Sequence, residues 1–303
     1  GDCVMPEQAG DVLEEKNLDY MIGVKDVFIP ESEIEVHTEE ILRLGYTVLE
    51  DAISEEDLGY LDGKLEKIYE TQLDEVGGEE VLKKIGDQYS AKHLITYDDF
   101  YLKLILNERV ISITKEILGE YFILHWNNAI LNFPGLYNPA SAWHRDIAYQ
   151  EYTTSKPLSL TALFILDDFS EETGGTIILP GSHLIPSFPS KGFAEKHGQQ
   201  VVAKAGTVVL FNSWMYHQAG YNQSQGIRRA IANVYTSPMI KQQISFPKLL
   251  DGKYSDNPYL KKLFGYECET ADSVLDYRLR RLKNRGDNYL TDKNRIGDLK
   301  DYA

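Results

Sequence analysis

The sequence predicts a mainly β fold, with a sandwich or barrel core backed by helices nearer the N-terminus. Between residues 121 and 237, short runs rich in β-branched and aromatic residues are separated by Gly, Pro, Asn and Asp, and no helical period is found. Several short strands at this spacing are typical of a sandwich or a barrel. Before residue 121, apolar residues recur three or four positions apart instead, as on one face of a helix.

Three helices and one strand are expected ahead of the β-rich part. Thr38, which two glutamates follow, resembles a helix start, and the strand 46–50 comes after that helix. Ser54 is expected to cap the second helix, in which apolar residues between positions 58 and 68 recur at helical spacing. The third helix is expected over about 98–118, with Gly119 as its stop.

The expected strands lie within five runs, and the chain shows no internal repeat or low-complexity tract. The runs are 122–133, 158–168, 175–183, 206–217 and 228–237. We therefore expect a single domain behind an acidic N-terminal extension (1–37). It consists of a helical part (38–120), the β-rich core (121–240) and a C-terminal extension (241–303).

Charge is distributed unevenly along the chain. Over 303 residues, 31 basic and 47 acidic side chains give a formal net charge of −16 and a pI near 4.9. Residues 1–60 alone hold 17 acidic and 3 basic side chains, so most of the excess lies there. The tail 278–300 is locally basic and is expected to pair with these acids or to stay solvated. An acidic protein lacks the basic surface of a general nucleic-acid binder, so we expect no such partner.

Cysteine content and hydropathy exclude several classes of protein. Cys3 and Cys268 alone make neither a disulfide framework nor a cysteine-based zinc site. No apolar run approaches the roughly 18 residues of a membrane span, so we expect no membrane partner. The first ten residues lack the basic and apolar regions of a signal peptide, and we expect a cytoplasmic location. Whether a leader has been removed is left open.

A His-x-Asp motif follows the first run of the β-rich part. Residues two apart in extended chain point to the same side, so His144 and Asp146 can offer a ring nitrogen and a carboxylate oxygen to one ion. His217, at the end of a later run, is the natural third ligand. Two histidines and one carboxylate describe the facial triad of non-heme iron oxygenases. An isolated His-x-Asp is weak evidence, and packing or surface roles are expected for the other histidines, which are His37, His93, His125, His183 and His197.

The arginine that opens the last run strengthens this interpretation. Arg228 lies eleven residues after His217, and a hairpin of this length returns an arginine to the side of the metal ligand. A buried guanidinium there can bind a carboxylate through two hydrogen bonds. Because side chains alternate along a strand, only one of Arg228 and Arg229 can point inward. The alternative is that the two form a surface pair.

In combination, these motifs resemble the phytanoyl-CoA dioxygenase family. They are His144-x-Asp146, EETGGTIILPGSH (171–183), and His217 with Arg228 eleven residues later. The resemblance covers roughly residues 41–285, from LRLGYTVLEDAIS to GYECETADSVLDYRLRR. It implies a double-stranded β-helix, also called a jelly roll or cupin-like fold. It also implies dependence on Fe(II), 2-oxoglutarate and O2, with ascorbate as a candidate reductant.

The resemblance also implies roles for individual residues. His144, Asp146 and His217 match the iron ligands of the family. Arg228 matches the arginine that pairs with the distal carboxylate of 2-oxoglutarate. Asn132, ahead of the metal motif, matches a polar position that is often near the cosubstrate.

Three positions bear on the pocket and the reaction. Ala219 stands where some members have a cosubstrate-binding serine, and Ala162 about where some carry a tryptophan. Small residues there imply a roomier pocket or a cosubstrate held by other side chains. Relatives that halogenate have a small residue in place of Asp146, so its presence implies hydroxylation rather than chlorination. Desaturation, epimerisation and ring closure would use the same ligands.

We expect the substrate to be a small molecule. The segments 147–157 and 184–200 are expected to flank the mouth of the site, and Tyr149 and Arg145 are candidates for contacting the substrate. No long apolar groove is evident in the sequence, which favours biosynthetic tailoring of a polar metabolite over oxidation of an acyl-CoA or another acyl substrate. We expect a monomer or a homodimer.

Two other functions compete with this prediction. A jelly-roll binding protein without turnover has no need for a complete triad together with Arg228. A hydrolytic metal enzyme requires a general base and has no use for Arg228. The sequence therefore favours a 2-oxoglutarate-dependent hydroxylase.

Overall fold

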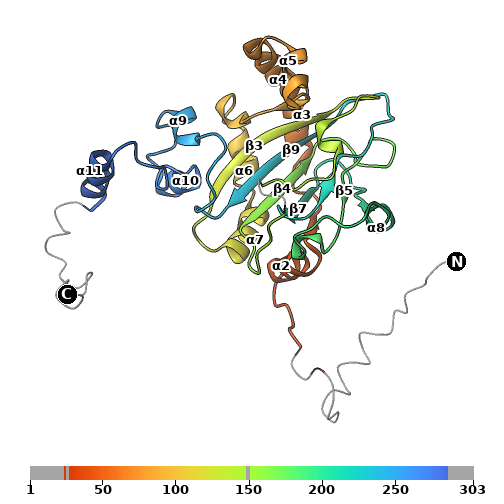
Figure 1. Ribbon diagram of the computed structural model, residues 1–303, viewed down its shortest axis with the longest axis horizontal. Coiled ribbons are helices and arrows are strands. Elements are labelled where there is room, and N and C mark those ends of the chain that lie inside the picture. Colours follow the sequence, from red (N-terminus) through yellow and green to blue (C-terminus); the bar gives the residue numbers. More distant parts are fainter. Residues whose placement is uncertain (1–23, 25–26, 148–150, 286–303) are drawn as a thin grey trace.

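The computed structural model describes residue 24 and residues 27–147 and 151–285 (Figure 1). Most of the predicted acidic extension and the end of the basic tail lie outside these ranges. Within them, no helix is both long and apolar enough to span a bilayer.

A six-stranded antiparallel sheet forms the centre of the fold. The strands are β1 (Tyr46–Leu49), β2 (Ser90–Ala91), β3 (Ile123–Asn132), β4 (Ser159–Ile165), β7 (Val208–Asn212) and β9 (Arg228–Thr236). They lie in the order β1-β7-β4-β9-β3-β2. The longest pairing joins β3 to β9 and places Asn132 opposite Arg228 at one end of both strands. The strands expected over 46–50 and within the runs 122–133, 158–168 and 228–237 are thereby confirmed.

A small sheet packs against one face of the large one. It consists of β5 (Ile177–Ile178), β6 (Gln199–Gln200) and β8 (His217–Gln218), in the order β6-β5-β8. Side chains from both sheets, among them Leu163 of β4 and Ile178 of β5, share one apolar cluster. Two antiparallel sheets around a common core are the architecture of a jelly roll, so the predicted fold is confirmed.

Helices cover the opposite face of the large sheet. Along β4, Leu160, Ala162 and Phe164 belong to the apolar cluster that includes the helix residue Ile113, whereas Leu163 belongs to the cluster between the sheets. Both faces of β4 are therefore buried, which explains its almost unbroken apolar sequence. Ala162 faces the helices, so the expectation that its small side chain enlarges the pocket is wrong.

The helices lie mainly in the N-terminal and C-terminal parts of the chain. They are α2 (Glu33–Leu44), α3 (Glu55–Leu61), α4 (Lys64–Val76), α5 (Glu79–Ile85), α6 (Tyr101–Ile105), α7 (Glu108–Leu118), α8 (Lys191–His197), α9 (Phe246–Leu250), α10 (Pro258–Leu263) and α11 (Val274–Arg285). Buried residues of α2, α4 and α7 belong to the cluster on the large sheet, which confirms the expected backing by N-terminal helices. In Figure 1, α9, α10 and α11 lie together beyond one end of the sheet.

Two helix boundaries differ from the predictions because of capping residues. The first helix begins at Glu33 rather than Thr38, because the Ser32 side chain accepts a hydrogen bond from the backbone N–H of Glu35. The helix expected over 98–118 is two helices, because Asn107 lies between them and its side chain caps α7.

Two further helix predictions are confirmed only in part or not at all. Ser54 caps a helix as expected, but this helix stops at Leu61, and Gly63 with φ 69° separates it from α4. Within the predicted β-rich part, Ser190 caps the short helix α8, so the expectation that no helix occurs there is wrong.

The segment 171–183 links the β core to α2 through hydrogen bonds. Gly174 has φ +70° and lies so close to Gly220 that an added Cβ would be 2.5 Å from the Gly220 carbonyl oxygen. Asn132 donates a hydrogen bond from Nδ2 to that same carbonyl over 2.9 Å. At the other end of the segment, buried His183 bonds through Nε2 to the Leu42 carbonyl over 3.1 Å, which confirms its predicted packing role.

We expect Gly174→Ala to lower the free energy of unfolding by about 2 kcal/mol or more, because the new Cβ meets backbone atoms and L side chains rarely adopt a positive φ. Gly192→Ala is the matched control, because an added Cβ there has no neighbour within 4 Å and alanine favours the helix. Urea denaturation of both variants measures the difference, and equal stabilities would contradict the prediction.

Candidate active site

Backbone pairing brings the three residues of the predicted triad together. His144 follows the short 3₁₀ helix η2 (Pro139–Ser141), and His217 opens β8. The two residues form an antiparallel bridge, in which each backbone N–H donates to the carbonyl of the other over 3.0 Å. The backbone N–H of Asp146 donates to the Ser213 carbonyl over 3.1 Å, which fixes the chain two residues further on.

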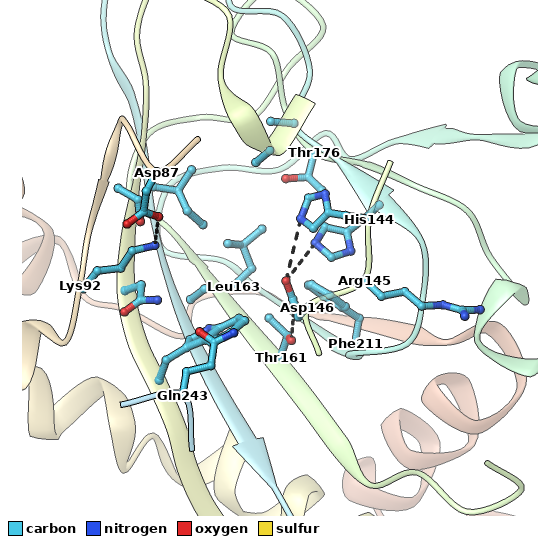
Figure 2. Close-up of a pocket in the computed structure, with 18 of the residues that line it drawn as sticks. Asp87, Lys92, His144, Arg145, Asp146, Thr161, Leu163, Thr176, Phe211 and Gln243 are labelled. Carbon is cyan, nitrogen blue, oxygen red and sulfur yellow. Dashed lines mark hydrogen bonds and ion pairs between the residues drawn. The ribbon is translucent and has the colours of Figure 1, made fainter. Parts of the chain in front are cut away.

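The potential ligand atoms converge on one point (Figure 2). Asp146 Oδ1 lies 3.4 Å from Nε2 of His217 and 4.0 Å from Nε2 of His144. One nitrogen or oxygen from each residue lies within 4.8 Å of the others. Two imidazole nitrogens and one carboxylate oxygen are the donor set of a facial triad, so the three side chains fit a divalent iron.

Backbone carbonyls set the tautomer of both histidines. His144 Nδ1 lies 2.7 Å from the carbonyl oxygen of Ala142, and His217 Nδ1 lies 3.0 Å from that of Met215. Because a carbonyl oxygen only accepts hydrogen bonds, Nδ1 of each ring carries a proton and the neutral ring presents its lone pair at Nε2. Metal-binding histidines are commonly oriented by hydrogen bonds of this kind.

Thr161 of β4 orients the Asp146 carboxylate. Its hydroxyl donates to Asp146 Oδ2 over 2.6 Å, which leaves Oδ1 facing the histidines. Burial alone would raise the pKa of Asp146, but the charge of His217 and its hydrogen bond outweigh burial, so the pKa is lowered. Asp146 is therefore ionised at neutral pH.

The two histidines respond differently to this carboxylate. Burial, together with the nearby charge of His217, lowers the pKa of His144 to about 4, so its ring is neutral at pH 7. Burial also acts to lower the pKa of His217, but the Asp146 carboxylate more than compensates and raises it. The carboxylate thus attracts positive charge to the place where the two Nε2 atoms meet. A bound cation displaces any proton there, because ligation requires neutral imidazole.

A buried arginine, two of whose donors lack a hydrogen-bond partner in the described residues, shares the cavity of the triad. Arg228, the first residue of β9, is 2% exposed, and its Nε and Nη2 have no hydrogen-bond partner in the described chain. Its guanidinium carbon lies 4.5 Å from the centre of the Phe169 ring. Burial lowers the pKa of Arg228 to about 10, so it remains charged at pH 7.

The next residue of β9 points the other way, as strand alternation predicts. Arg229 donates from Nε and Nη2 to the two carboxylate oxygens of Asp167, over 2.8 and 2.9 Å. It also donates from Nη1 to Asp62 over 2.7 Å. The hydrogen-bond donors of Arg229 are thus paired with carboxylates of the protein. Arg228 has unused donors, from which a carboxylate of a ligand can accept hydrogen bonds.

One cavity of about 340 Å³ is lined by both the triad and Arg228. Ala219 also lines it, which places this small residue where the resemblance implies. In Figure 2, the side chains of Asp87 and Lys92 lie across the cavity from the histidines, and the two pair with each other over 2.8 Å. The sequence did not indicate this wall, because it comes from a segment far from the metal motif.

The predicted cosubstrate contact of Asn132 is not supported. Its Nδ2 donates to the carbonyls of Gly220 and Gly174, over 2.9 and 3.4 Å. Asn132 is not among the residues that line the cavity. Through the Gly220 carbonyl, it holds the chain in place three residues after His217, and it does not line the cavity.

Of the two predicted substrate contacts, the structure describes only Arg145. Arg145 reaches the cavity wall, but its guanidinium points away from the triad in Figure 2. From there it donates to the carbonyls of Ser182 and Ile185 over 2.9 and 2.7 Å, so it packs the loop after β5. Tyr149 lies outside the described residues. No residue of the segment 184–200 lines this cavity, and its predicted place at the mouth of the site stays a prediction.

Sequence comparison finds relatives over most of the chain. The sequence profile of the family "Phytanoyl-CoA dioxygenase (PhyH)" matches residues 41–230, more than half of the chain. The "Uncharacterized protein Rv1501" of Mycobacterium tuberculosis is 29% identical over 241 residues, 77% of this chain and 87% of that protein. A "Probable alpha-ketoglutarate-dependent hypophosphite dioxygenase" of Stutzerimonas stutzeri is 25% identical over 245 residues, 72% of this chain and 82% of that protein.

A solved structure shares the fold. It is the epimerase SnoN in complex with Fe3+, alpha ketoglutarate and nogalamycin RO, with a TM-score of 0.51. The match covers 70% of this chain and 88% of that one at 18% identity. At this identity the likeness concerns the fold alone, and it agrees with the jelly roll seen here.

We expect Thr161→Val to weaken Fe(II) binding about 10- to 100-fold, because the Asp146 carboxylate loses the hydroxyl that orients it. Thr114→Val is the matched control, because this buried hydroxyl donates to the Val110 carbonyl within α7, on the helical side of the large sheet. Anaerobic Fe(II) titration of the three proteins measures the effect. An affinity of Thr161→Val equal to that of the control would show that the carboxylate needs no such support.

Proposed function

The chain belongs to the phytanoyl-CoA dioxygenase family, and we propose that it uses Fe(II) and 2-oxoglutarate to hydroxylate an unactivated C–H bond of a small molecule. The substrate, O2 and 2-oxoglutarate give the hydroxylated product, succinate and CO2. One atom of O2 enters the product and the other enters succinate. In this proposal His144, Asp146 and His217 hold the iron, and Arg228 holds the distal carboxylate of 2-oxoglutarate.

The unpaired guanidinium of Arg228 carries the proposal. A buried charge is costly unless an opposite charge and hydrogen bonds compensate it, and no described residue accepts a hydrogen bond from its Nε or Nη2. The same cavity also holds the His-Asp-His triad. A diacid that reaches from one to the other satisfies both sites, whereas hydrolysis requires no such cation.

The side chains of the site bind, orient and shield the reactants. Bound iron supplies the activation of O2 that is coupled to oxidation of 2-oxoglutarate. Three protein ligands leave positions open for the cosubstrate and O2. The carbonyls of Ala142 and Met215 keep both Nε2 lone pairs available. Leu163 and Phe211, which line the cavity, reduce access of water to the reacting atoms.

Within the family, the ligand set favours hydroxylation over chlorination, whereas desaturation, epimerisation and ring closure would use the same ligands. The Asp146 carboxylate occupies the position where halogenating relatives have a small residue, and its Thr161 hydrogen bond holds it there. A related protein from Stutzerimonas stutzeri is named as a probable alpha-ketoglutarate-dependent dioxygenase, which supports 2-oxoglutarate as the cosubstrate. A binding protein without turnover is disfavoured, because the two imidazoles and the carboxylate retain the orientation that ligation needs.

Spectroscopy and product analysis test the proposal directly. Wild-type protein with Fe(II) and 2-oxoglutarate under nitrogen should give the weak visible absorption of an iron-bound 2-oxo acid, and His217→Ala should abolish it. After admission of O2, with ascorbate as reductant, succinate should form. A wild-type protein that gives neither the absorption nor succinate with any substrate would instead be a binding protein.

Arg228→Met should lower the affinity for 2-oxoglutarate by about 100-fold, because the distal carboxylate loses a buried, charged partner. The same variant should raise the melting temperature of the ligand-free protein, because it removes a buried charge whose Nε and Nη2 have no hydrogen-bond partner among the described residues. Isothermal titration with Fe(II) present and thermal unfolding measure the two effects.

Arg229→Met is the matched control for this variant. It breaks the ion pairs with Asp167 and Asp62 and should lower the melting temperature, but it should leave the affinity for 2-oxoglutarate within about two-fold of wild type. If the two arginine variants change 2-oxoglutarate affinity equally, the assignment of Arg228 fails.

A further inference from the structure

A second cavity, of about 560 Å³, adjoins the cavity of the triad. The two share Gln243 in their linings. Ile147 follows Asp146 in the chain, and Trp214 follows Ser213, whose carbonyl accepts the hydrogen bond from the Asp146 backbone. We name this space the apolar annex, and its lining consists of His125, Ile147, Tyr152, Trp214, Met239, Ile240, Lys241 and Gln243.

Most of the annex wall is apolar. Ile147 and Trp214 are buried, and Ile240 packs against them in a small separate cluster. Met239 and Tyr152 are 75% and 54% exposed, so the wall continues to the surface. Apolar side chains gathered around a concave space of this size are typical of sites for apolar ligands.

Two polar atoms in this wall lack partners. Neither Nε1 of Trp214 nor Nδ1 of His125 has a hydrogen-bond partner within the part of the chain that the structure describes. A buried indole N–H usually finds an acceptor. Because both atoms are almost wholly covered, an oxygen atom of a bound molecule would instead accept from the donors that line the annex itself, Lys241 and the Gln243 amide.

The charged wall of the neighbouring cavity is already satisfied. Asp87 and Lys92 compensate each other over 2.8 Å, so an ionic substrate has to break their pair before it gains a contact. Apart from Arg228, which the proposed function assigns to 2-oxoglutarate, and Lys241, an exposed residue of the annex, the described linings of the two cavities therefore offer a substrate no uncompensated charge.

From these contacts we infer that the substrate is a largely apolar small molecule that carries a hydrogen-bond-accepting oxygen and binds with its apolar body in the annex. This inference rests on the proposed function, because it assigns the substrate of the same oxygenase site. It replaces the polar metabolite that the sequence favoured. That preference came from the absence of an apolar groove in the sequence pattern, but the annex is assembled from segments far apart in the chain.

A fluorescent probe tests the annex without turnover. The full chain with Mn(II) and 2-oxoglutarate, kept under nitrogen, is titrated with 1-anilinonaphthalene-8-sulfonate, whose emission rises in apolar surroundings. We expect saturable binding of one dye molecule per chain. Ile240→Asn and Met239→Asn should each weaken this binding, the former at least ten-fold, because a polar amide replaces apolar wall.

Val202→Asn is the matched control, because Val202 is 74% exposed and does not line the annex. It should leave the dye affinity unchanged. Met239 is itself exposed, so Met239→Asn keeps the test valid if Ile240→Asn unfolds, and melting temperatures report that case. Absence of saturable binding to wild type, or unchanged affinity in the folded annex variants, would overturn the inference.

The ligand class is tested by displacement of the bound dye. Progesterone, an apolar ring compound with carbonyl oxygens, should displace it, and L-proline should not. Displacement by proline alone would reject an apolar substrate. The affinity for 2-oxoglutarate, measured on the same samples, distinguishes a failure of the annex inference from a failure of the proposed function. If 2-oxoglutarate binds and the dye does not, only the inference about the annex is wrong. If 2-oxoglutarate does not bind, the proposed function is wrong.

Discussion

The antiparallel pairing of residue 144 with residue 217 is the contact on which the rest of the site depends. It holds the two imidazole rings with their centres 4.3 Å apart and aligns Asp146 with the Ser213 carbonyl. It also opens β8, and the chain then returns through a hairpin to β9, whose first residue is Arg228. One backbone bridge therefore sets the positions of the three triad residues, and the hairpin that follows it sets the position of Arg228.

The site holds a buried charge whose hydrogen-bond donors are partly unused. Arg229 and Asp167 compensate each other on the outer side of β9, whereas Arg228 on the inner side has donors without acceptors. Such a group costs stability, and the two buried apolar layers on either side of β4 offset that cost. The arrangement is preorganised, because the cation and the ligand atoms stand in place before the diacid arrives. The excess negative charge of the chain lies mostly in the first 60 residues, so the net charge of the chain does not indicate the charge of this cavity.

Sequence reasoning recovered what depends on spacing along one strand or hairpin. The His-x-Asp spacing, the return from His217 to Arg228 and the alternation of Arg228 with Arg229 are all of this kind. It failed where the answer lies in contacts between distant segments, so Thr161 beside Asp146 and the paired wall across the cavity were not foreseen. Ala162 was assigned to the pocket although its neighbour Thr161 points there, because a shift of one residue reverses the face of a strand. The role of Asn132 was not foreseen either, because sequence does not tell whether a buried amide donates to a ligand or, as here, to backbone carbonyls.

The most direct test of the account compares two cosubstrates in two proteins. 2-Oxopentanoate matches 2-oxoglutarate except that a methyl group replaces the distal carboxylate. In the presence of Fe(II) and without O2, wild-type protein should bind 2-oxoglutarate about 100-fold more tightly than 2-oxopentanoate, because only the diacid reaches Arg228. Arg228→Met should bind both compounds with similar affinity, which isolates the pairing of the carboxylate with the guanidinium. If the variant keeps the full preference for the diacid, another group holds the distal carboxylate and the account is wrong.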